Sequence, residues 1–424
     1  MLDIRQIRKE PDAVRERLKA RGGDAWMLID AVLECDEARR KGETEKQALQ
    51  AERNTVSKEI GIGRREGKDT SAQEARGKAI GERIAAIGEE TAAHDDKQRD
   101  LLLGIPNLPH DACPVGTDET ANPVVREWGE KPEIADPIDH VALGTSLGLL
   151  DFELAAKISG SGFVVFTGQG ARLERALLNF LLDLHTGEHG YKEVNTPFVI
   201  QRDCMFGTGQ LPKFEEDMYG LEDGKMFLAP TAEVPVTNLE REKILKLEEM
   251  PIKYAAYTPC FRREAGSAGR ETRGLIRMHQ FDKVELVKVV HPDRSFDELE
   301  DLTANAEKVL QLLGLHYRTI ELCTGDLGFS SAKTYDIEVW APGQGKYLEV
   351  SSCSNFADYQ ARRMNLRFKG EDGKNHFCHT LNGSGTALPR LYVALLETYQ
   401  QPDGSVKLPE PLHRYFGASE IKPA

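Results

Sequence analysis

No run of apolar residues in this 424-residue chain approaches the roughly 20 residues that a membrane-spanning helix needs. The N-terminal stretch MLDIRQIRKEPDAV lacks the apolar core of a secretory signal, and it carries acidic residues that a transit peptide avoids. We therefore expect a protein of the cytoplasm without a membrane partner.

Cysteine pairs and an excess of positive charge are also absent. The seven cysteines are scattered and contain no CxxC pair, which indicates neither a disulfide framework nor a zinc site. We therefore expect reduced thiols and no zinc. The net charge of −14 argues against binding of nucleic acid over the whole surface. Any contact with RNA must then come from a local basic patch.

Two stretches of helical periodicity occupy the first quarter of the chain. Residues at four-three spacing run from Leu28 to Ile60 and again from Ile80 to Leu101, with a break at 61–68. This spacing predicts two helices that pack as an antiparallel coiled-coil hairpin. Taken alone, such a hairpin is more often a dimerisation coil or a spacer. The basic residues at its tip are Arg64, Arg65 and Lys68.

A segment dense in Pro, Gly, Asn and Asp follows the second helix, from Gly104 to about Pro123. This composition is typical of a linker between domains. The chain therefore divides into an N-terminal domain at 1–104, a linker at 105–123 and a larger domain at 124–424.

Within the larger domain, the stretch TPCFRREAGSAGRETRGLIRMHQFDKVELVK predicts a strand, a long loop and a second strand. Side-chain alternation places Arg262 and Glu264 on one face of the first strand, and Phe281, Lys283 and Glu285 on one face of the second. A guanidinium, a flat aromatic ring and a carboxylate suit a phosphate, a purine and an ammonium group. An ordinary hairpin with a charged loop would give the same pattern.

Two smaller polar groups offer ligand contacts. Thr231 and Glu233 place a hydroxyl and a carboxylate one residue apart, which suits a small polar ligand or a helix N-cap. Glu349 and Ser352 carry oxygen ligands suited to Mg²⁺ on a strand predicted at 345–368. Because they lie three residues apart, a bulge or a strand end is needed to bring both to one ion. A glutamate on an edge strand is the ordinary alternative.

Two helices complete the predictions for the larger domain. A long apolar-striped helix from Gly170 is followed by a strand that contains Pro197. Near the C-terminus, residues 382–385 (NGSG) predict a tight turn, and a helix begins at Pro389. Arg390 falls off the apolar stripe of that helix, so it can point at a ligand or simply lie on the surface.

Together these segments resemble class II aminoacyl-tRNA synthetases and, more narrowly, the seryl-tRNA synthetase family. FRxEAG…TRG…HQFDKVE is similar to motif 2, the helix and the Pro197 strand to motif 1, and the segment GSGTALPR that ends at Arg390 to motif 3. LxPTAEVPxTN resembles the TxE loop of the seryl family, and ExSSCSNFxDxQARR resembles its ion-binding strand. The helical hairpin resembles the arm that grips the long variable arm of serine tRNA.

The resemblance implies an α+β fold, in which a coiled-coil hairpin precedes a catalytic domain with an antiparallel sheet flanked by helices. HIGH, KMSKS and P-loop motifs are absent. The implied protein is a homodimer that binds ATP, L-serine, Mg²⁺ and tRNA(Ser), with tRNA(Sec) as a second candidate acceptor. The serine carboxylate attacks the α-phosphate of ATP to give seryl-adenylate and pyrophosphate. A terminal ribose hydroxyl of the tRNA then takes the seryl group.

The resemblance also implies residue roles. Arg262 holds the α-phosphate and the serine carboxylate, Arg390 lies near the γ-phosphate, and both count as catalytic. Phe281 stacks on adenine, while Glu264 contacts its amino group. Glu349 and Ser352 hold the ion. The implied ATP-binding residues are Arg262, Arg263, Glu264, Phe281, Glu349, Val350, Ser351, Ser352 and Arg390. The implied serine-binding residues are Thr231, Ala232, Glu233, Arg262, Glu285, Asn382 and Ser384. The cations at the hairpin tip are the implied tRNA contacts.

Three alternatives compete with this interpretation. A synthetase-like ligase that loads an amino acid on a carrier protein would lack the hairpin. A paralogue could act on a serine analogue or confer resistance to an antibiotic that mimics seryl-adenylate. A coiled-coil adaptor with an inactive catalytic domain would have no need to retain the site residues Arg262, Phe281, Glu285, Glu349 and Arg390.

Overall fold

The computed structural model describes residues 1–265 and 274–423, and it forms two compact units. One unit comprises Leu2–Lys19 and Gly23–Pro106. The other comprises Met1, Ala20–Gly22 and the chain from Asn107 onward. Within the described ranges, no helix has both the length and the apolar character that crossing a membrane would require.

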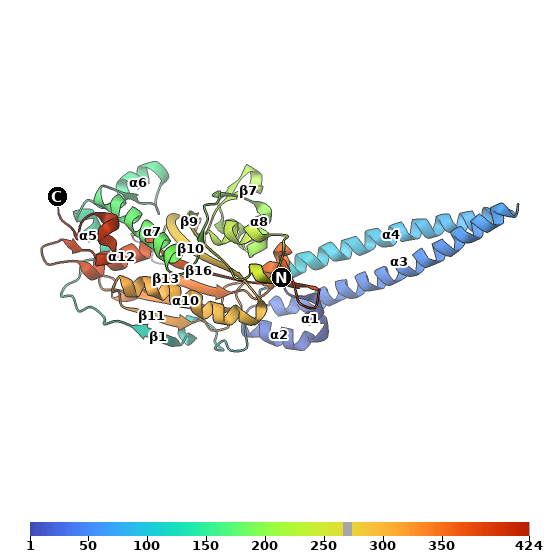
Figure 1. Cartoon of the computed structure of the whole chain (residues 1–424), viewed down its shortest axis with the longest axis horizontal. Helices are drawn as coiled ribbons and strands as arrows, with labels where there is room; N and C mark the ends of the chain where they lie inside the picture. The colour runs from blue at the N-terminus through green and yellow to red at the C-terminus, as the bar shows by residue number, and fades with distance from the viewer. Residues whose placement is uncertain (266–273, 424) are drawn as a thin grey trace. The chain divides into compact units, whose positions relative to one another are not determined.

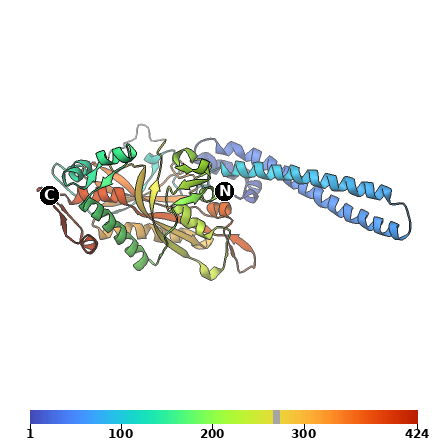
Figure 2. The same cartoon turned by 90° about the horizontal axis from the view of Figure 1, so that it is seen from above.

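The first unit is helical. It contains α1 (Ile4–Lys9), α2 (Pro11–Ala20), α3 (Leu28–Arg65) and α4 (Ser71–Leu103). Helices α3 and α4 lie side by side as a hairpin (Figures 1 and 2), as the spacing predicts. Helix α3 continues to Arg65, into the break expected at 61–68. A Cβ atom on Gly63 would lie 2.8 Å from Cγ2 of Thr70, so the chain closes tightly just before the turn.

The second unit is built on an eight-stranded sheet in the order β1-β11-β12-β13-β16-β10-β9-β4. Its neighbouring strands are antiparallel except β4 and β9, which are parallel. The strands are β1 (Val124–Trp128), β4 (Lys192–Glu193), β9 (Ile252–Phe261), β10 (Gln280–Val290), β11 (Tyr317–Glu321), β12 (Lys333–Ala341), β13 (Lys346–Asn355) and β16 (His379–Ala387). The predicted antiparallel sheet is thereby confirmed.

Helices and smaller sheets surround this sheet. The helices are α5 (His140–Ser146), α6 (Phe152–Ser159), α7 (Gln169–Gly187), α8 (Arg202–Thr208), α9 (Glu233–Thr237), α10 (Ser295–Leu312), α11 (Tyr359–Met364), α12 (Leu388–Tyr399) and α13 (Glu410–Phe416). The short strands are β2 (Leu150–Asp151), β3 (Val165–Phe166), β5 (Val199–Gln201), β6 (Gly220–Leu221), β7 (Met226–Leu228), β8 (Ile244–Leu245), β14 (Arg367–Lys369), β15 (Asn375–Phe377), β17 (Val406–Lys407) and β18 (Glu420–Ile421).

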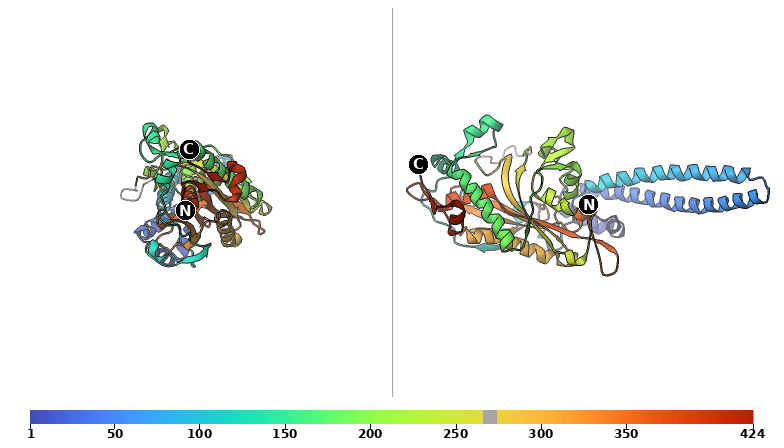
Figure 3. Two further views of the ribbon diagram at one scale, coloured as in Figure 1. Left: turned by 90° about the vertical axis from the view of Figure 1, so that its left-hand side faces the viewer. Right: turned by 45° about the horizontal axis from the view of Figure 1, so that its top comes forward.

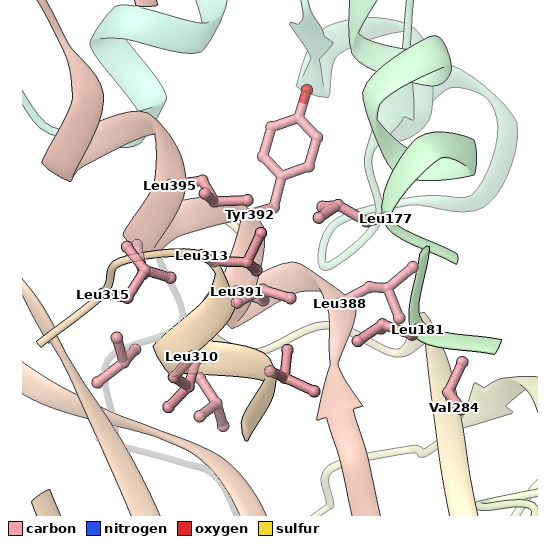
Figure 4. Packing of buried hydrophobic residues seen from close by; sticks show 14 of the residues in the cluster. Leu177, Leu181, Val284, Leu310, Leu313, Leu315, Leu388, Leu391, Tyr392 and Leu395 are labelled. Carbon is pink, nitrogen blue, oxygen red and sulfur yellow. The ribbon is translucent and has the colours of Figure 1, made fainter. Parts of the chain in front are cut away.

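The main core lies between the sheet and helices α7, α10 and α12. Figure 3 shows α7, in green, beside the yellow strands β9 and β10, which it contacts. Figure 4 shows leucines of the three helices in the same buried cluster as Val284 of β10. Because side chains alternate along a strand, Val284 and Leu286 face these helices. Phe281, Lys283 and Glu285 therefore share the opposite face of β10, as predicted.

Three predicted elements differ from the structure. The strand expected at 345–368 ends at Asn355 and is followed by helix α11 and strand β14. The first strand of the 258–288 stretch ends at Phe261, so Arg262 and Glu264 lie beyond it. Pro197 falls in the gap between β4 and β5 because a proline has no N–H to donate to a strand ladder.

The tight turn predicted at 382–385 is also wrong, because these residues lie inside β16. Their glycines permit close packing beneath a central strand. A Cβ atom on Gly383 would lie 2.8 Å from Sγ of Cys353, and one on Gly385 would lie 2.7 Å from Nε2 of His185. Glycine in a strand interior often marks such an approach, which sequence alone does not distinguish from a turn.

Candidate active site

A pocket of about 470 Å³ lies on the sheet face that carries Phe281, Lys283 and Glu285. Strands β10, β13 and β16 form its floor, and the starts of α9 and α12 and the ends of the 262–277 segment form its walls. The predicted site residues in its lining are Thr231, Glu233, Arg262, Glu264, Phe281, Glu285, Glu349, Val350, Ser352, Asn382, Ser384 and Arg390.

Glu285 is the hydrogen-bonding centre at one end of the pocket. Asn382 Nδ2 donates to its Oε1 at 2.9 Å, and Thr231 Oγ1 donates to its Oε2 at 3.3 Å. Lys283 forms an ion pair with the same carboxylate. The register places Ser384 directly opposite Glu285 on the neighbouring strand. Four polar groups of defined position therefore surround a small space.

Glu233 adds a second carboxylate at this end. It begins α9 and is buried, and Gln360 Nε2 donates to its Oε1 at 2.7 Å. Burial, reinforced by the negative charge of Glu285, raises the pKa of Glu233 to about 7. Two neighbouring carboxylates thus share the cation of Lys283, an arrangement that favours a second positive group such as a ligand ammonium.

Arg262 and Phe281 form the second part of the pocket. The guanidinium carbon of Arg262 lies 5.3 Å from the centre of the Phe281 ring, and Nε donates to the Pro230 carbonyl at 3.2 Å. Glu264 has a positive φ of 51°, and its carboxylate forms an ion pair with Arg277. A flat ring beside a fixed guanidinium suits a nucleotide base and its phosphate.

Arg390 reaches the pocket from the first turn of α12. Its Nη1 donates to the Glu349 carbonyl at 2.7 Å, and its Nε donates to the Ile276 carbonyl at 3.2 Å. Pro389 occupies the start of this helix, where a missing N–H costs no hydrogen bond. The predicted placement of Arg390 off the apolar stripe is confirmed.

Of the two arrangements that the spacing of Glu349 and Ser352 allowed, a bulge and a strand end, β13 has the bulge. Ile337 of β12 pairs with Ser351, and Glu338 pairs with Glu349, so Val350 is the extra residue. This bulge lets Glu349 and Ser352 line the same pocket although they lie three residues apart. Their carboxylate and hydroxyl oxygens fit Mg²⁺. Asp336 lies opposite Ser352, and its Oδ1 is buried without a hydrogen-bond partner among the described residues.

Three predicted site residues lie outside the pocket wall. Ala232 is buried in an apolar cluster with Val236, and Arg263 is exposed. Ser351 Oγ donates to the Ser384 carbonyl at 2.6 Å, so it ties β13 to β16. Each of these residues neighbours a residue that does face the pocket. Residues 266–273 of the predicted motif 2 loop lie outside the described residues.

Sequence reasoning missed three polar residues of the site. Lys283 lies on the predicted face of β10 and pairs with Glu285, so its position already indicated a role. Arg277 pairs with Glu264 across the loop. Gln360 holds Glu233 from helix α11, and the predicted continuous strand concealed that helix.

The tip of the hairpin is exposed and charged. Arg64 pairs with Glu74 at 2.9 Å, Lys68 pairs with Glu66 at 2.7 Å, and Arg65 is exposed. Ion pairs at exposed positions are weak, so a polyanion can displace them. The tip is therefore open to phosphate contacts.

A family model of the tRNA synthetase class II core domain (G, H, P, S and T) matches residues 215–399. The sheet and its pocket are accordingly those of a class II aminoacyl-tRNA synthetase. The model of the seryl-tRNA synthetase N-terminal domain matches residues 1–109, and a serine–tRNA ligase of Akkermansia muciniphila is 68% identical over 423 residues, covering 100% of this chain and 99% of that protein. The chain belongs to the seryl-tRNA synthetase family, and its activity is that of a serine–tRNA ligase.

Solved structures agree over the whole chain. The seryl-tRNA synthetase of Pyrococcus horikoshii, complexed with ATP, superposes with a TM-score of 0.94 at 38% identity and 100% coverage of both chains. The cytoplasmic serine–tRNA ligase of Naegleria fowleri, in complex with AMP, superposes with a TM-score of 0.89 at 30% identity and covers 100% of this chain and 99% of that one.

Proposed function

We propose that the pocket activates L-serine with ATP and that the seryl group is then passed to tRNA(Ser). One observation carries this proposal. The carboxylates of Glu233 and Glu285 share one pocket with the stacked pair of Arg262 and Phe281. An amino acid and a nucleotide can therefore lie end to end, with the serine carboxylate directed at the α-phosphate. The ATP and AMP complexes of the two similar structures support a nucleotide site in this fold.

The serine site is formed by the groups around Glu285. Glu233 and Thr231 contact the ammonium group, and Glu285 and Ser384, with Asn382 nearby, contact the side-chain hydroxyl. The peptide of Ala232 joins the two ammonium contacts. A substrate without the hydroxyl leaves buried polar partners unpaired, so alanine is rejected.

The nucleotide site is formed by the two arginines and Phe281. Arg262 binds the α-phosphate and the serine carboxylate, Phe281 stacks on adenine, and Glu264 accepts a hydrogen bond from the adenine amino group. Arg390 binds near the γ-phosphate. Catalysis consists of alignment and of charge neutralisation at phosphorus, because the serine carboxylate is itself the nucleophile. Arg263, Val350 and Ser351 support this site through the backbone.

Glu349 and Ser352 would hold Mg²⁺ at the bulge of β13. The ion, when bound, neutralises phosphate charge and orients the leaving pyrophosphate. Among the described residues no three His, Cys, Asp or Glu side chains form a metal cluster. We therefore infer that ATP phosphates supply further ligands, as is usual for Mg²⁺.

The organisation of the whole protein follows the same proposal. Residues 1–104 form the tRNA-binding domain, 105–123 the linker and 124–424 the catalytic domain. The cations Arg64, Arg65 and Lys68 contact tRNA phosphates, and tRNA(Sec) is a second candidate acceptor. Two copies associate through α7 and the strand that follows it, and the enzyme acts in the cytoplasm.

Serine-dependent exchange of pyrophosphate into ATP tests the proposal. Serine should support rapid exchange, and alanine should support it far more weakly, since discrimination by paired polar groups reaches about 10⁴-fold. Threonine keeps the hydroxyl, and it should also support weaker exchange because its extra methyl group needs room among the groups around Glu285. Equal exchange with alanine would remove the assigned serine site.

A further inference from the structure

A second buried polar network lies outside the pocket, between α5 and α12. His140 is 1% exposed and Glu397 is 0% exposed. The His140 backbone N–H donates to Glu397 Oε1 at 2.9 Å, and Nδ1 of its ring lies 2.9 Å from the same oxygen. Gln344 donates to Oε1 from its side chain at 2.8 Å and to Oε2 from its backbone at 3.2 Å.

This network fixes which imidazole nitrogen carries the proton. A carboxylate accepts hydrogen bonds, so the ring of His140 donates from Nδ1 to Glu397. Nε2 is then left as an acceptor, and the Leu275 backbone N–H donates to it at 3.2 Å. Gly274 makes the approach possible, because a Cβ atom there would lie 2.3 Å from Nε2. The ring thus links the Glu397 carboxylate to the backbone N–H of Leu275.

That peptide belongs to the pocket wall. Leu275, Ile276 and Arg277 all line the pocket. The Ile276 carbonyl accepts from Arg390 Nε, and Arg277 pairs with Glu264. A hydrogen bond at Leu275 therefore holds the segment that orients both Arg390 and Glu264.

We propose that His140 is a positioning residue for ATP: Nε2 of its ring holds the 274–277 segment in the conformation that presents Arg390 and Glu264 to the nucleotide. This inference rests on the proposed ATP roles of those two residues. His140 touches no substrate, and the serine end of the pocket is formed by other elements. Loss of the Nε2 acceptor should therefore weaken ATP binding and leave serine binding unchanged.

Two substitutions test the roles of the two nitrogens of the His140 ring separately. In His140→Gln the side-chain amide reaches the position of Nε2 and can still accept from Leu275. In His140→Asn the shorter amide reaches the position of Nδ1, so it keeps the contact with Glu397 and loses the one with Leu275. Both variants replace the ring by a smaller side chain, so both should have a lowered Tm. Gln344→Met is a matched control that removes a donor to Glu397 without touching Leu275.

The experiment measures KM for ATP and for serine in pyrophosphate exchange with the full chain. His140→Asn should raise KM for ATP about three- to tenfold above that of His140→Gln, the effect of one neutral hydrogen bond. KM for serine should stay within about twofold in both, and Gln344→Met should lower Tm without changing KM for ATP. If His140→Asn does not fold, Gly274→Ala, which displaces the same segment, should raise KM for ATP instead.

Equal KM values for ATP in the two His140 variants, or a parallel rise in KM for serine, would overturn the positioning role while the wild-type exchange still supports the proposed function. A wild-type enzyme without serine-dependent exchange would overturn the proposed function itself.

Discussion

At the scale of single residues, Arg262 carries the strongest prediction. Its guanidinium lies beside Phe281 and donates to the Pro230 carbonyl, and in the proposed function it binds the α-phosphate in the transition state. Arg262→Ala should lower kcat/KM for serine-dependent exchange by about 10²–10³ or more, as removal of a transition-state donor does. The Tm should change little. Arg263→Ala is the matched control, because that neighbouring side chain is exposed and outside the pocket wall. A loss below tenfold for Arg262→Ala would contradict the motif 2 assignment.

Glu233 should make stability depend on pH. Its pKa rises from 4.5 to about 7 in the folded chain, chiefly through burial. The unfolded chain loses this proton first as the pH rises, so the free energy of unfolding should fall by about 3 kcal/mol between pH 4.5 and pH 8. Glu233→Gln removes the titrating group and should abolish that fall.

Denaturant unfolding of the wild type and of Glu233→Gln, both without serine, measures how the free energy of unfolding depends on pH. The variant should gain stability relative to the wild type as the pH rises. A difference between the two proteins that stays constant from pH 4.5 to pH 8 would show that Glu233 ionises normally.

At the scale of secondary-structure elements, β16 depends on its glycines. A Cβ atom on Gly383 would meet Cys353 Sγ at 2.8 Å and Leu302 Cγ at 3.3 Å. Gly383→Ala should therefore lower the free energy of unfolding by about 1–3 kcal/mol through overpacking. Cys353→Ala removes the closest atom, so the double variant should lose less than the sum of the single losses. Thermal unfolding of the wild type, the two single variants and the double variant gives the coupling free energy between positions 383 and 353. Strictly additive losses would exclude a contact between the new Cβ atom and Cys353 Sγ.

The elements also show what sequence could predict. Helical periodicity predicted α3 and α4. The spacing of Glu349 and Ser352 predicted either a bulge or a strand end, and the structure has a bulge at Val350. The prediction for residues 382–385 was wrong because their glycines are required by close contacts with Cys353 and His185, which are distant in sequence. Likewise Gln360 holds Glu233 from 127 residues away, a contact that no local pattern encodes. Local sequence patterns thus predicted helices and strands, whereas the wrong or missed predictions depended on packing between residues that are distant in sequence.

At the scale of the whole molecule, the hairpin should serve the tRNA step alone. The pocket residues all lie outside Met27–Leu101. Deleting the hairpin between those helix ends should leave serine-dependent exchange within a few-fold and lower tRNA charging severely. Raising the salt concentration should mimic the deletion in part, because phosphate contacts release counterions.

A triple variant of the tip, with Arg64, Arg65 and Lys68 each changed to Ala, provides the comparison for that deletion. It should lose less charging activity than the deletion, because further lysines and arginines lie along α3 and α4. Undiminished charging by the deleted protein would show that the arm is a spacer and would revive the carrier-protein alternative.

The uneven seam of the hairpin has a mechanical consequence. Where α3 begins and α4 ends, Ile29, Val32, Cys35, Leu102 and Leu103 are buried close together. Between Asp36 and the tip, the buried apolar side chains of the two helices are Val56, Ile80 and Ile87. The seam thus holds most firmly where α3 begins and α4 ends. Toward the tip, where the turn at 66–70 joins the two helices, fewer apolar side chains are buried, so that part of the rod can bend and open locally at little cost. On the proposed function, such compliance would let one rod follow RNA acceptors whose outlines differ by a few ångströms.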